Sequence, residues 1–215
     1  VVALLALALG IAAPFMASLA SAEATLEEVI VTAQKREQNL QNVGTSITAL
    51  GSTDLQAQGL KDATSIAAMT PGLQFNQYSP TITVYNLRGV SQNDFSDHQE
   101  APVAVYVDDA YVASMGALAG SMYDIDRVEI LRGPQGTLFG RNATGGLIHY
   151  ISKHPTADTS GYLDLTASNY GTFNTQGAFN GALGDSTYGR LSFATDKHNA
   201  YIHNRIGPDI NDQAQ

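Results

Sequence analysis

Hydrophobic and polar residues alternate along the last quarter of the chain, in runs of about ten residues. The residues on the apolar side are Leu163, Leu165 and Ala167, then Phe173, Thr175, Phe179 and Leu183, then Leu191, Phe193 and Thr195. Those on the polar side are Asp164, Thr166 and Ser168, then Asn174, Gln176 and Asn180, then Arg190, Ser192 and Asp196. Turn residues separate the runs, notably Gly184-Asp185-Ser186. Such strands are typical of a membrane-spanning barrel, but a soluble antiparallel sheet has the same periodicity.

Between residues 43 and 157 the pattern is mixed and every element is short. Strands are predicted at 43–50, 73–76, 81–89, 103–112 and 126–133. A helix is predicted to begin with a Ser52/Thr53 cap and to close at Gly59, and a second helix to stop at Pro71-Gly72. Short elements in mixed order predict an α+β domain with a small, incomplete mixed sheet rather than a doubly wound fold.

The first 22 residues are predicted to be a targeting segment. The chain is almost wholly apolar up to Met16, and Ala20-Ser21-Ala22 fits the small-x-small pattern of a signal-peptidase site. The alternative is a transmembrane anchor, but the run is shorter than the roughly 20 residues that a span requires. No basic stop follows it. We therefore expect an incomplete signal peptide at 1–22, and an exported protein.

Residues 23–42 combine a short β-forming stretch with a polar one. Val29-Ile30-Val31-Thr32-Ala33 favours an extended strand, and the residues from Gln34 to Asn42 favour a flexible linker. We expect that so short a strand cannot bury itself, and that its backbone donors and acceptors stay free. Another protein could then pair with it by strand addition. An edge strand of the adjoining domain is the alternative, and the pattern does not separate the two.

Composition narrows the possible functions. The net charge of −9 at pH 7 and the pI near 4.8 argue against nucleic acid as a partner. The absence of cysteine excludes disulfides, thiolate metal sites and thiol nucleophiles. The 20 glycines and 10 tyrosines suit a turn-rich β protein.

No motif for catalysis, metal binding or cofactor binding is present. The glycines after Leu131 are not followed by Lys and then Ser or Thr, so the phosphate-binding loop pattern fails. The five histidines are scattered, and His149 is predicted to be a hydrogen-bonded structural residue on a strand. Asp108-Asp109 is predicted to form a turn, with paired catalytic carboxylates as the weaker interpretation. We therefore predict no enzyme activity, no metal and no cofactor.

Several segments together resemble the N-terminal part of a TonB-dependent outer-membrane receptor. They are "EEVIVTAQKREQNLQNV", "TPGLQF", "YNLRGV", "VAVYVDDAYV" and "DRVEILRGPQGTLFGRNATGGLIHYISKHPT". The resemblance implies a plug at 43–157, followed at 158–215 by the first strands of a transmembrane antiparallel barrel of about 22 strands. Only three or four strands fit after the plug, so the chain is interpreted as a fragment of a longer receptor, truncated at both ends.

The resemblance also implies roles for particular residues. Residues 23–42 would hold the TonB box and a linker, and the box residues Glu28, Val29, Ile30, Val31, Thr32 and Ala33 would pair with TonB, energised by ExbB and ExbD. Proton-motive force would then move the plug and admit bound ligand. Arg88 and Arg132 would latch the plug to acidic residues of the barrel wall. Gly133, Gly136, Gly140, Gly145 and Gly146 would allow sharp turns and positive φ in the plug, with Pro134 fixing one corner.

The ligand class is implied only by the family. Its members carry ferric siderophores, haem, cobalamin or oligosaccharides across the outer membrane of Gram-negative bacteria, and a ferric siderophore is our default. The plug apex would include 76–81 and 91–100, where Tyr78, Phe95 and His98 could contact ligand, although mobile loop residues are the commoner explanation. A free-standing exported plug-like binding module without transport is the alternative. A periplasmic enzyme is disfavoured by the missing motifs.

Overall fold

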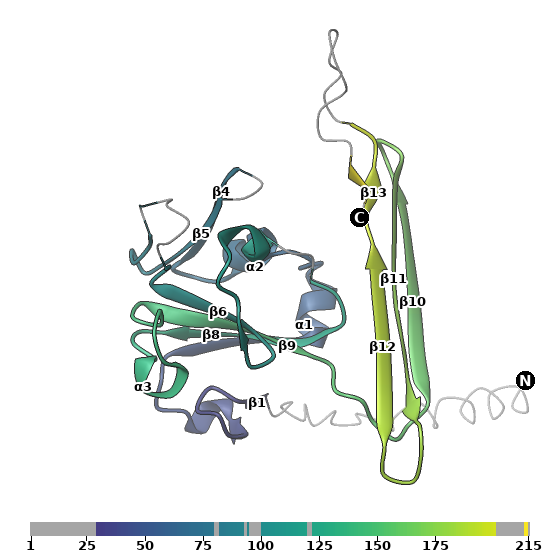
Figure 1. Cartoon of the computed structure of the whole chain (residues 1–215), viewed down its shortest axis with the longest axis horizontal. Coiled ribbons are helices and arrows are strands. Elements are labelled where there is room, and N and C mark those ends of the chain that lie inside the picture. The colour runs from purple at the N-terminus through teal and green to yellow at the C-terminus, as the bar shows by residue number, and fades with distance from the viewer. Residues whose placement is uncertain are drawn as a thin grey trace, which may run out of the picture.

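A computed structural model of the chain describes residues 29–79, 82–92, 94, 100–119, 122–200 and 213–214. The predicted signal peptide lies outside these residues. The described residues form two parts, a mixed domain that ends with strand β9 (Gly146–Ser152) and a long three-stranded sheet beside it (Figure 1). We call the first part, residues 29–152, the core domain. None of the helices in the described ranges is long and apolar enough to cross a membrane.

A five-stranded mixed sheet forms the centre of the core domain. Its strand order is β3 (Ile47–Gly51), β8 (Ile125–Arg132), β9, β6 (Val103–Val107) and β7 (Ala110–Tyr111). The β6–β9 pair is parallel and the other pairs are antiparallel. Strands β6 and β9 are buried along most of their length because other elements cover both faces of the sheet. The predicted α+β class with a small mixed sheet is confirmed.

Two hydrophobic clusters lie on opposite faces of this sheet. Residues at alternate positions of β8 and β9, such as Ile130 and Ile148, join the cluster that includes Leu55 and Ile66 of the helices. The intervening positions, such as Leu131 and Leu147, face the other cluster. Figure 1 shows helices α1 and α2 on one side of the sheet and β1 on the other. The alternation along β8 and β9 thus separates the two faces.

The helices are short and differ in how they begin. Helix α1 (Ser52–Ala57) has Gly51 at its N-cap and no side-chain cap bond, so the predicted Ser52/Thr53 cap is wrong. Ser52 continues directly from strand β3 and already lies inside the helix. Helix α2 (Ala63–Met69) begins with a capping box, in which Asp62 accepts a 2.7 Å bond from the Ser65 backbone N–H. The chain leaves α2 at Pro71-Gly72, as predicted, with Gly72 at φ +80°.

The remaining elements of the core domain are hairpins and single turns. Strands β4 (Leu73–Ser79) and β5 (Ile82–Leu87) pair with each other, as do the two-residue strands β1 (Ile30–Val31) and β2 (Gln38–Asn39). Short helical turns are η1 (Leu40–Asn42), η2 (Met115–Ala119) and α3 (Gly136–Phe139). Asp108 and Asp109 form the β6–β7 turn, as predicted, and the Asp108 carboxylate accepts from the Ser152 N–H at 2.8 Å.

The second part is an antiparallel sheet of three long strands, β10 (Ser160–Ser168), β11 (Thr172–Ala182) and β12 (Tyr188–Thr195). Its register places Gly161, Phe179 and Leu191 side by side, and Ser160, Asn180 and Arg190 side by side. The predicted apolar and polar sides are therefore the two faces of one sheet. After β12, strand β13 (Lys197–His198) pairs with β14 (Gln213–Ala214).

Candidate functional site

Residues 29–33, which we call the docked segment, lie against the core domain. Val31 and Ala33 are buried in the cluster that contains Leu131, Leu147 and Phe139. The expectation that this strand cannot bury itself is wrong, because it folds back on β2 and places alternate apolar side chains on the sheet. Ile30, on the opposite side of the segment, is 40% exposed. Glu28 lies outside the described residues.

A carboxylate of strand β8 holds the docked segment by its backbone. Glu129 Oε1 accepts a 2.8 Å hydrogen bond from the Thr32 N–H and a 3.2 Å bond from the Thr32 hydroxyl. The Glu129 side chain is fully buried, and Arg127 Nε donates to the same Oε1 atom at 2.8 Å. Burial lowers the pKa of Arg127, but its bonds to Glu129 and Asp126 outweigh this and raise that pKa. The buried carboxylate is thus neutralised by an arginine that stays charged.

His149 lies opposite Glu129 on the neighbouring strand β9. Its ring packs edge-on against Tyr106 and Phe139, at centroid distances of 6.3 and 6.4 Å. Burial lowers the pKa of His149, although the negative charge of Glu129 opposes the shift. The ring is therefore neutral at pH 7. Among the described residues neither ring nitrogen has a partner of ordinary hydrogen-bond geometry, although the Asp108 backbone acts on the ring and opposes the lowering of its pKa. The buried position among aromatic rings agrees with the predicted structural role.

The glycine-rich loop after β8 folds back onto its own sheet. The Tyr106 hydroxyl donates to the Phe139 carbonyl at 2.6 Å, and the Gly133 N–H donates to the Gly145 carbonyl at 3.1 Å. Gly133, Gly140 and Gly146 have positive φ, as predicted. Gly136 and Gly145 do not, and Gly136 lies in helix α3.

Close packing explains two of these glycines. A Cβ at Gly146 would lie 2.4 Å from the Leu131 carbonyl oxygen, and one at Gly145 would lie 2.7 Å from the Val90 side chain. The loop's backbone is therefore used to close the domain rather than to cradle a ligand.

The two arginines predicted as latches lie near each other on the core domain. Arg88 Nη2 donates to the Ser46 hydroxyl at 3.0 Å, and Arg132 Nη2 donates to the Pro71 carbonyl at 3.3 Å. Burial and then the positive charge of Arg88 lower the pKa of Arg132. Among the described residues neither arginine forms an ion pair with a carboxylate. The pair is thus positively charged and lacks a carboxylate within the described part of the chain.

Of the predicted apex residues, the structure describes Tyr78 alone. It lies near the end of β4 and is 64% exposed. Phe95 and His98 lie outside the described residues. The ligand-contact site at the apex therefore stays a prediction.

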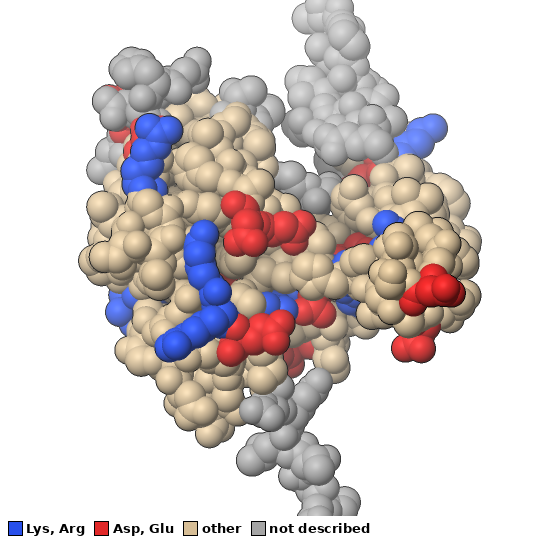
Figure 2. All heavy atoms as spheres, turned by 60° about the horizontal axis from the view of Figure 1, so that its bottom comes forward, with Lys and Arg blue, Asp and Glu red and all other residues tan. Residues whose placement is uncertain are grey.

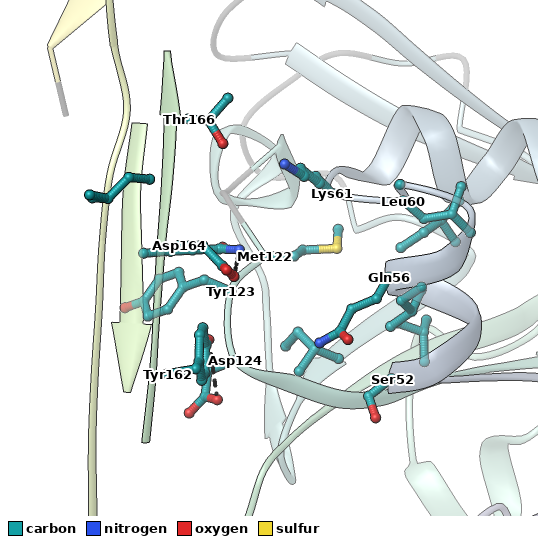
Figure 3. A pocket seen from close by; sticks show the side chains of 17 residues that line it. Ser52, Gln56, Leu60, Lys61, Met122, Tyr123, Asp124, Tyr162, Asp164 and Thr166 are labelled. Atoms are coloured by element: carbon teal, nitrogen blue, oxygen red, sulfur yellow. Dashed lines mark hydrogen bonds between the residues drawn. The ribbon is translucent and has the colours of Figure 1, made fainter. Parts of the chain in front are cut away.

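A cleft of about 410 Å³ separates the core domain from the three-stranded sheet. Figure 3 shows Tyr162 and Asp164 of β10 on one side of it and Gln56 and Lys61 on the other.

A carboxylate–guanidinium pair, which no sequence pattern predicted, joins the core domain to the three-stranded sheet at the edge of this cleft. Asp124 accepts two bonds from Arg190 of β12, from Nε at 2.6 Å and from Nη2, and one from the Tyr162 hydroxyl at 3.5 Å.

Asp124 and Arg190 were not linked by any sequence signal. They lie 66 residues apart, and Asp124 falls in a turn where an acidic residue is ordinary. Their side chains are 5% and 13% exposed, so the pair is shielded from water. Because both guanidinium contacts converge on one carboxylate, the pair fixes orientation as well as distance.

The charges do not suggest a metal centre or a nucleic-acid surface. The described part of the chain contains no group of three or more His, Asp or Glu side chains placed to hold a metal ion. On the face shown in Figure 2, basic and acidic side chains lie next to one another over the core domain. No single-sign patch dominates that face.

Comparison with known sequences identifies similar proteins. A family model described as the TonB-dependent receptor plug domain matches residues 39–147. The chain is 29% identical over 188 residues to the pesticin receptor of Yersinia pestis, which covers 85% of this chain and 27% of that protein. It is 30% identical over 161 residues to the ferripyoverdine receptor of Pseudomonas aeruginosa, covering 74% of this chain and 19% of that protein. The chain spans about a quarter of the length of the pesticin receptors that it matches.

Solved structures show the same arrangement. The ferric yersiniabactin uptake receptor FyuA from Yersinia pestis matches with a TM-score of 0.69 and 28% identity, over 77% of this chain and 26% of that chain. The pyoverdine outer membrane receptor FpvA from Pseudomonas aeruginosa has a TM-score of 0.67 over 80% of this chain and 25% of that chain. At 22% identity the second match supports the fold alone.

Proposed function

The chain belongs to the family of TonB-dependent receptor plug domains, and from this premise we propose that it is the gating part of an outer-membrane transporter. Residues 43–157 act as the plug, and 158–215 supply the first strands of the surrounding barrel. Residues 1–22 act as a signal peptide, and 23–42 as the TonB box and linker. The family consists of transporters and receptors rather than enzymes. Its members reside in the outer membrane of Gram-negative bacteria.

The observation that carries this proposal is the orientation of the three-stranded sheet. Its polar face meets the core domain through Asp124, Tyr162 and Arg190. Its other face carries exposed Leu163, Leu165, Phe173, Phe179, Leu191 and Phe193. A soluble sheet buries its apolar face in a core, whereas a barrel strand turns it to lipid. This arrangement disfavours the alternative of a free-standing binding module.

We infer that the plug is held on both sides by charge pairs. The Asp124–Arg190 pair lies at the first strands, inside the described chain. The positively charged pair of Arg88 and Arg132, which has no carboxylate partner among the described residues, supports the predicted latch to acidic residues of the barrel wall. Arginine suits that task because its planar guanidinium donates two parallel hydrogen bonds to a carboxylate in one orientation. Partners of this kind would fix the plug in the barrel from two directions.

TonB is the proposed energising partner, with ExbB and ExbD behind it. The β-forming pattern of residues 28–33 supports pairing by strand addition. The ligand is a small molecule, and a ferric siderophore is the class favoured by the similar ferric yersiniabactin uptake receptor and ferripyoverdine receptor. A vitamin B12 transporter of Vibrio vulnificus, 27% identical over 86% of this chain and 30% of that protein, keeps cobalamin as the second candidate.

Replacing Ile30 with proline tests the proposed transport role. Proline removes a backbone donor from the added strand, so energised uptake should be abolished while ligand binding is kept. The control is Ile30→Val, which retains the N–H and the branched side chain and should transport normally. Uptake of ⁵⁵Fe-loaded siderophores, haem and cobalamin by cells that express the complete receptor measures both variants. Normal energised uptake by Ile30→Pro would show that the box is misplaced.

The ligand class needs a separate experiment. A strain that lacks the complete gene should lose growth on one class of iron source or vitamin and keep growth on the others. Siderophores, haem, cobalamin and oligosaccharides form the panel. If every source supported normal growth, uptake of these classes would be excluded as the function.

A further inference from the structure

One backbone edge of the docked segment is paired with β2, and the other edge is occupied at Thr32. On one edge, β1 pairs with β2, and the Leu40 N–H donates to the Val29 carbonyl at 2.9 Å. Because hydrogen-bonding groups alternate along an antiparallel strand, the N–H groups of Ile30 and Thr32 point to the other edge. There the Thr32 N–H donates to Glu129, and the Thr32 carbonyl accepts from the Lys35 N–H at 2.8 Å. A partner strand therefore finds no free edge beside Thr32.

Glu129 is an unusual residue for a central strand. Its side chain is completely buried, and its neighbours on the same face of β8 and β9 include Leu131 and Leu147. A buried carboxylate is costly unless charge and hydrogen bonds compensate. Here the compensation comes from Arg127 and from the docked segment itself, while Oε2 has no hydrogen-bond partner among the described residues. The hydrogen bonds of the Glu129 carboxylate thus hold the docked segment, and do not join the strands of the sheet.

We propose that Glu129 is a positioning residue that holds residues 29–33 on the core domain, so that this segment pairs with TonB only after its bond to Glu129 has broken. The inference rests on the proposed function, because it assumes that the segment is the TonB box. The inference identifies the contact between Thr32 and Glu129 as the one that determines the fraction of molecules in which the docked segment is released from the core domain. Glu129 and an added strand compete for the same donor, because both would accept a hydrogen bond from the Thr32 N–H.

The charge on Glu129 determines the strength of this contact. A hydrogen bond to a carboxylate is about twice as strong as one to a neutral carbonyl. Glu129→Gln keeps the shape and one acceptor but loses the charge, so the released population should rise about tenfold. Thr32→Val removes the two weaker hydroxyl contacts, to Glu129 at 3.2 Å and from Arg127 Nη2 at 3.3 Å, and keeps the N–H, so the rise should be smaller. The matched control is Glu37→Gln, an exposed acid in the same β1–β2 turn.

Spin labelling of the complete receptor in lipid nanodiscs measures the released population. The chain contains no cysteine, so Ile30→Cys supplies a single labelling site within it, and cysteines elsewhere in the receptor would first be replaced. The mobile fraction of the spectrum should increase about tenfold in Glu129→Gln, less in Thr32→Val and not in Glu37→Gln. Circular dichroism of each variant shows whether the plug and barrel stay folded. An unchanged mobile fraction in folded Glu129→Gln and Thr32→Val would overturn the proposal.

Binding of the purified C-terminal domain of TonB separates this inference from the proposed function. If both are correct, Glu129→Gln should bind that domain several times more tightly than the unmodified receptor. If the unmodified receptor binds TonB and Ile30→Pro does not, while Glu129→Gln changes neither label mobility nor affinity, the role of Glu129 is wrong and the transport role stands. If Glu129→Gln frees the label but no variant binds TonB, the proposed function fails instead.

Discussion

The core domain and the three-stranded sheet use the same alternation of apolar and polar residues for opposite purposes. In β8 and β9 both sets of alternate positions are buried, because the helices cover one face and the docked segment covers the other. In β10–β12 one set meets the core domain through polar groups, and the other set is exposed, with Leu191 at 73% and Phe179 at 64%. The alternation therefore predicts that a strand has two different faces, but not whether each face contacts the protein core, another domain or lipid. That depends on the elements packed around the strand.

The junction between the two regions provides the largest expected effect. Replacing Asp124 with leucine leaves the Arg190 guanidinium without its partner in a shielded position. Loss of one member of a buried pair costs about 3–5 kcal/mol, so the plug should be held less firmly in the barrel. Urea unfolding of the complete receptor, followed by plug-specific fluorescence, measures this loss.

A double variant sharpens that experiment. In Asp124→Leu/Arg190→Leu neither charge remains unpaired, so the part of the loss that comes from the unpaired charge should return, while the strain of leucine at the positive φ of residue 124 (+56°) remains. If Asp124→Leu were as stable as the unmodified receptor, the pair would not connect the two regions.

The exposed face of the sheet gives the next effect. Arginine in place of Leu191 should destabilise the receptor by about 2–4 kcal/mol in a bilayer, because a charge near the middle of the lipid face is costly. Ser192→Arg, one residue further on the polar face, is the control and should cost much less. Refolding into lipid vesicles at increasing urea concentrations compares the two. Equal losses would mean that the two faces have the same surroundings.

A smaller effect is expected from a buried hydroxyl pair in the core domain. The hydroxyls of Tyr85 and Tyr150 lie 2.9 Å apart, and burial raises the pKa of Tyr150 to about 12. Tyr150→Phe leaves Tyr85 unpaired and should cost about 1–2 kcal/mol, whereas replacing both should be nearly neutral. A double-mutant cycle by thermal unfolding measures the coupling, and purely additive losses would contradict it.

The same pair gives the core domain a pH dependence with a defined sign. Tyr150 stays protonated in the folded state at a pH where the unfolded chain ionises, so its contribution is complete below about pH 10. Stability should fall as the pH rises from about 10 to 12, and the fall should be shallower in the double phenylalanine variant.

Local patterns in the sequence predicted much of the fold. The motifs identified the family, and the alternation of apolar and polar residues assigned the two faces of β10–β12. Both signals can be read from the sequence because they depend only on residues that are close together along the chain. The contacts that no sequence pattern predicted join distant residues: Thr32 and Glu129 are 97 residues apart, and Asp124 and Arg190 are 66 apart. Within "DRVEILRG" the acid at 129 fits an ordinary half-exposed strand, and nothing nearby indicates that a segment covers it. Docking of residues 29–33 depends on this distant contact with Glu129, so no local pattern could predict it.

The central claim is that the apolar face of β10–β12 lies against lipid while its polar face carries the plug. Spin labels placed one at a time at residues 189–195 of the complete receptor in lipid vesicles test it most directly. Collisions with oxygen, which dissolves in the bilayer, should be frequent at 191 and 193 and rare at 190, 192 and 194. Uniform values along β12, or frequent collisions with a water-soluble nickel complex at 191 and 193, would contradict the claim.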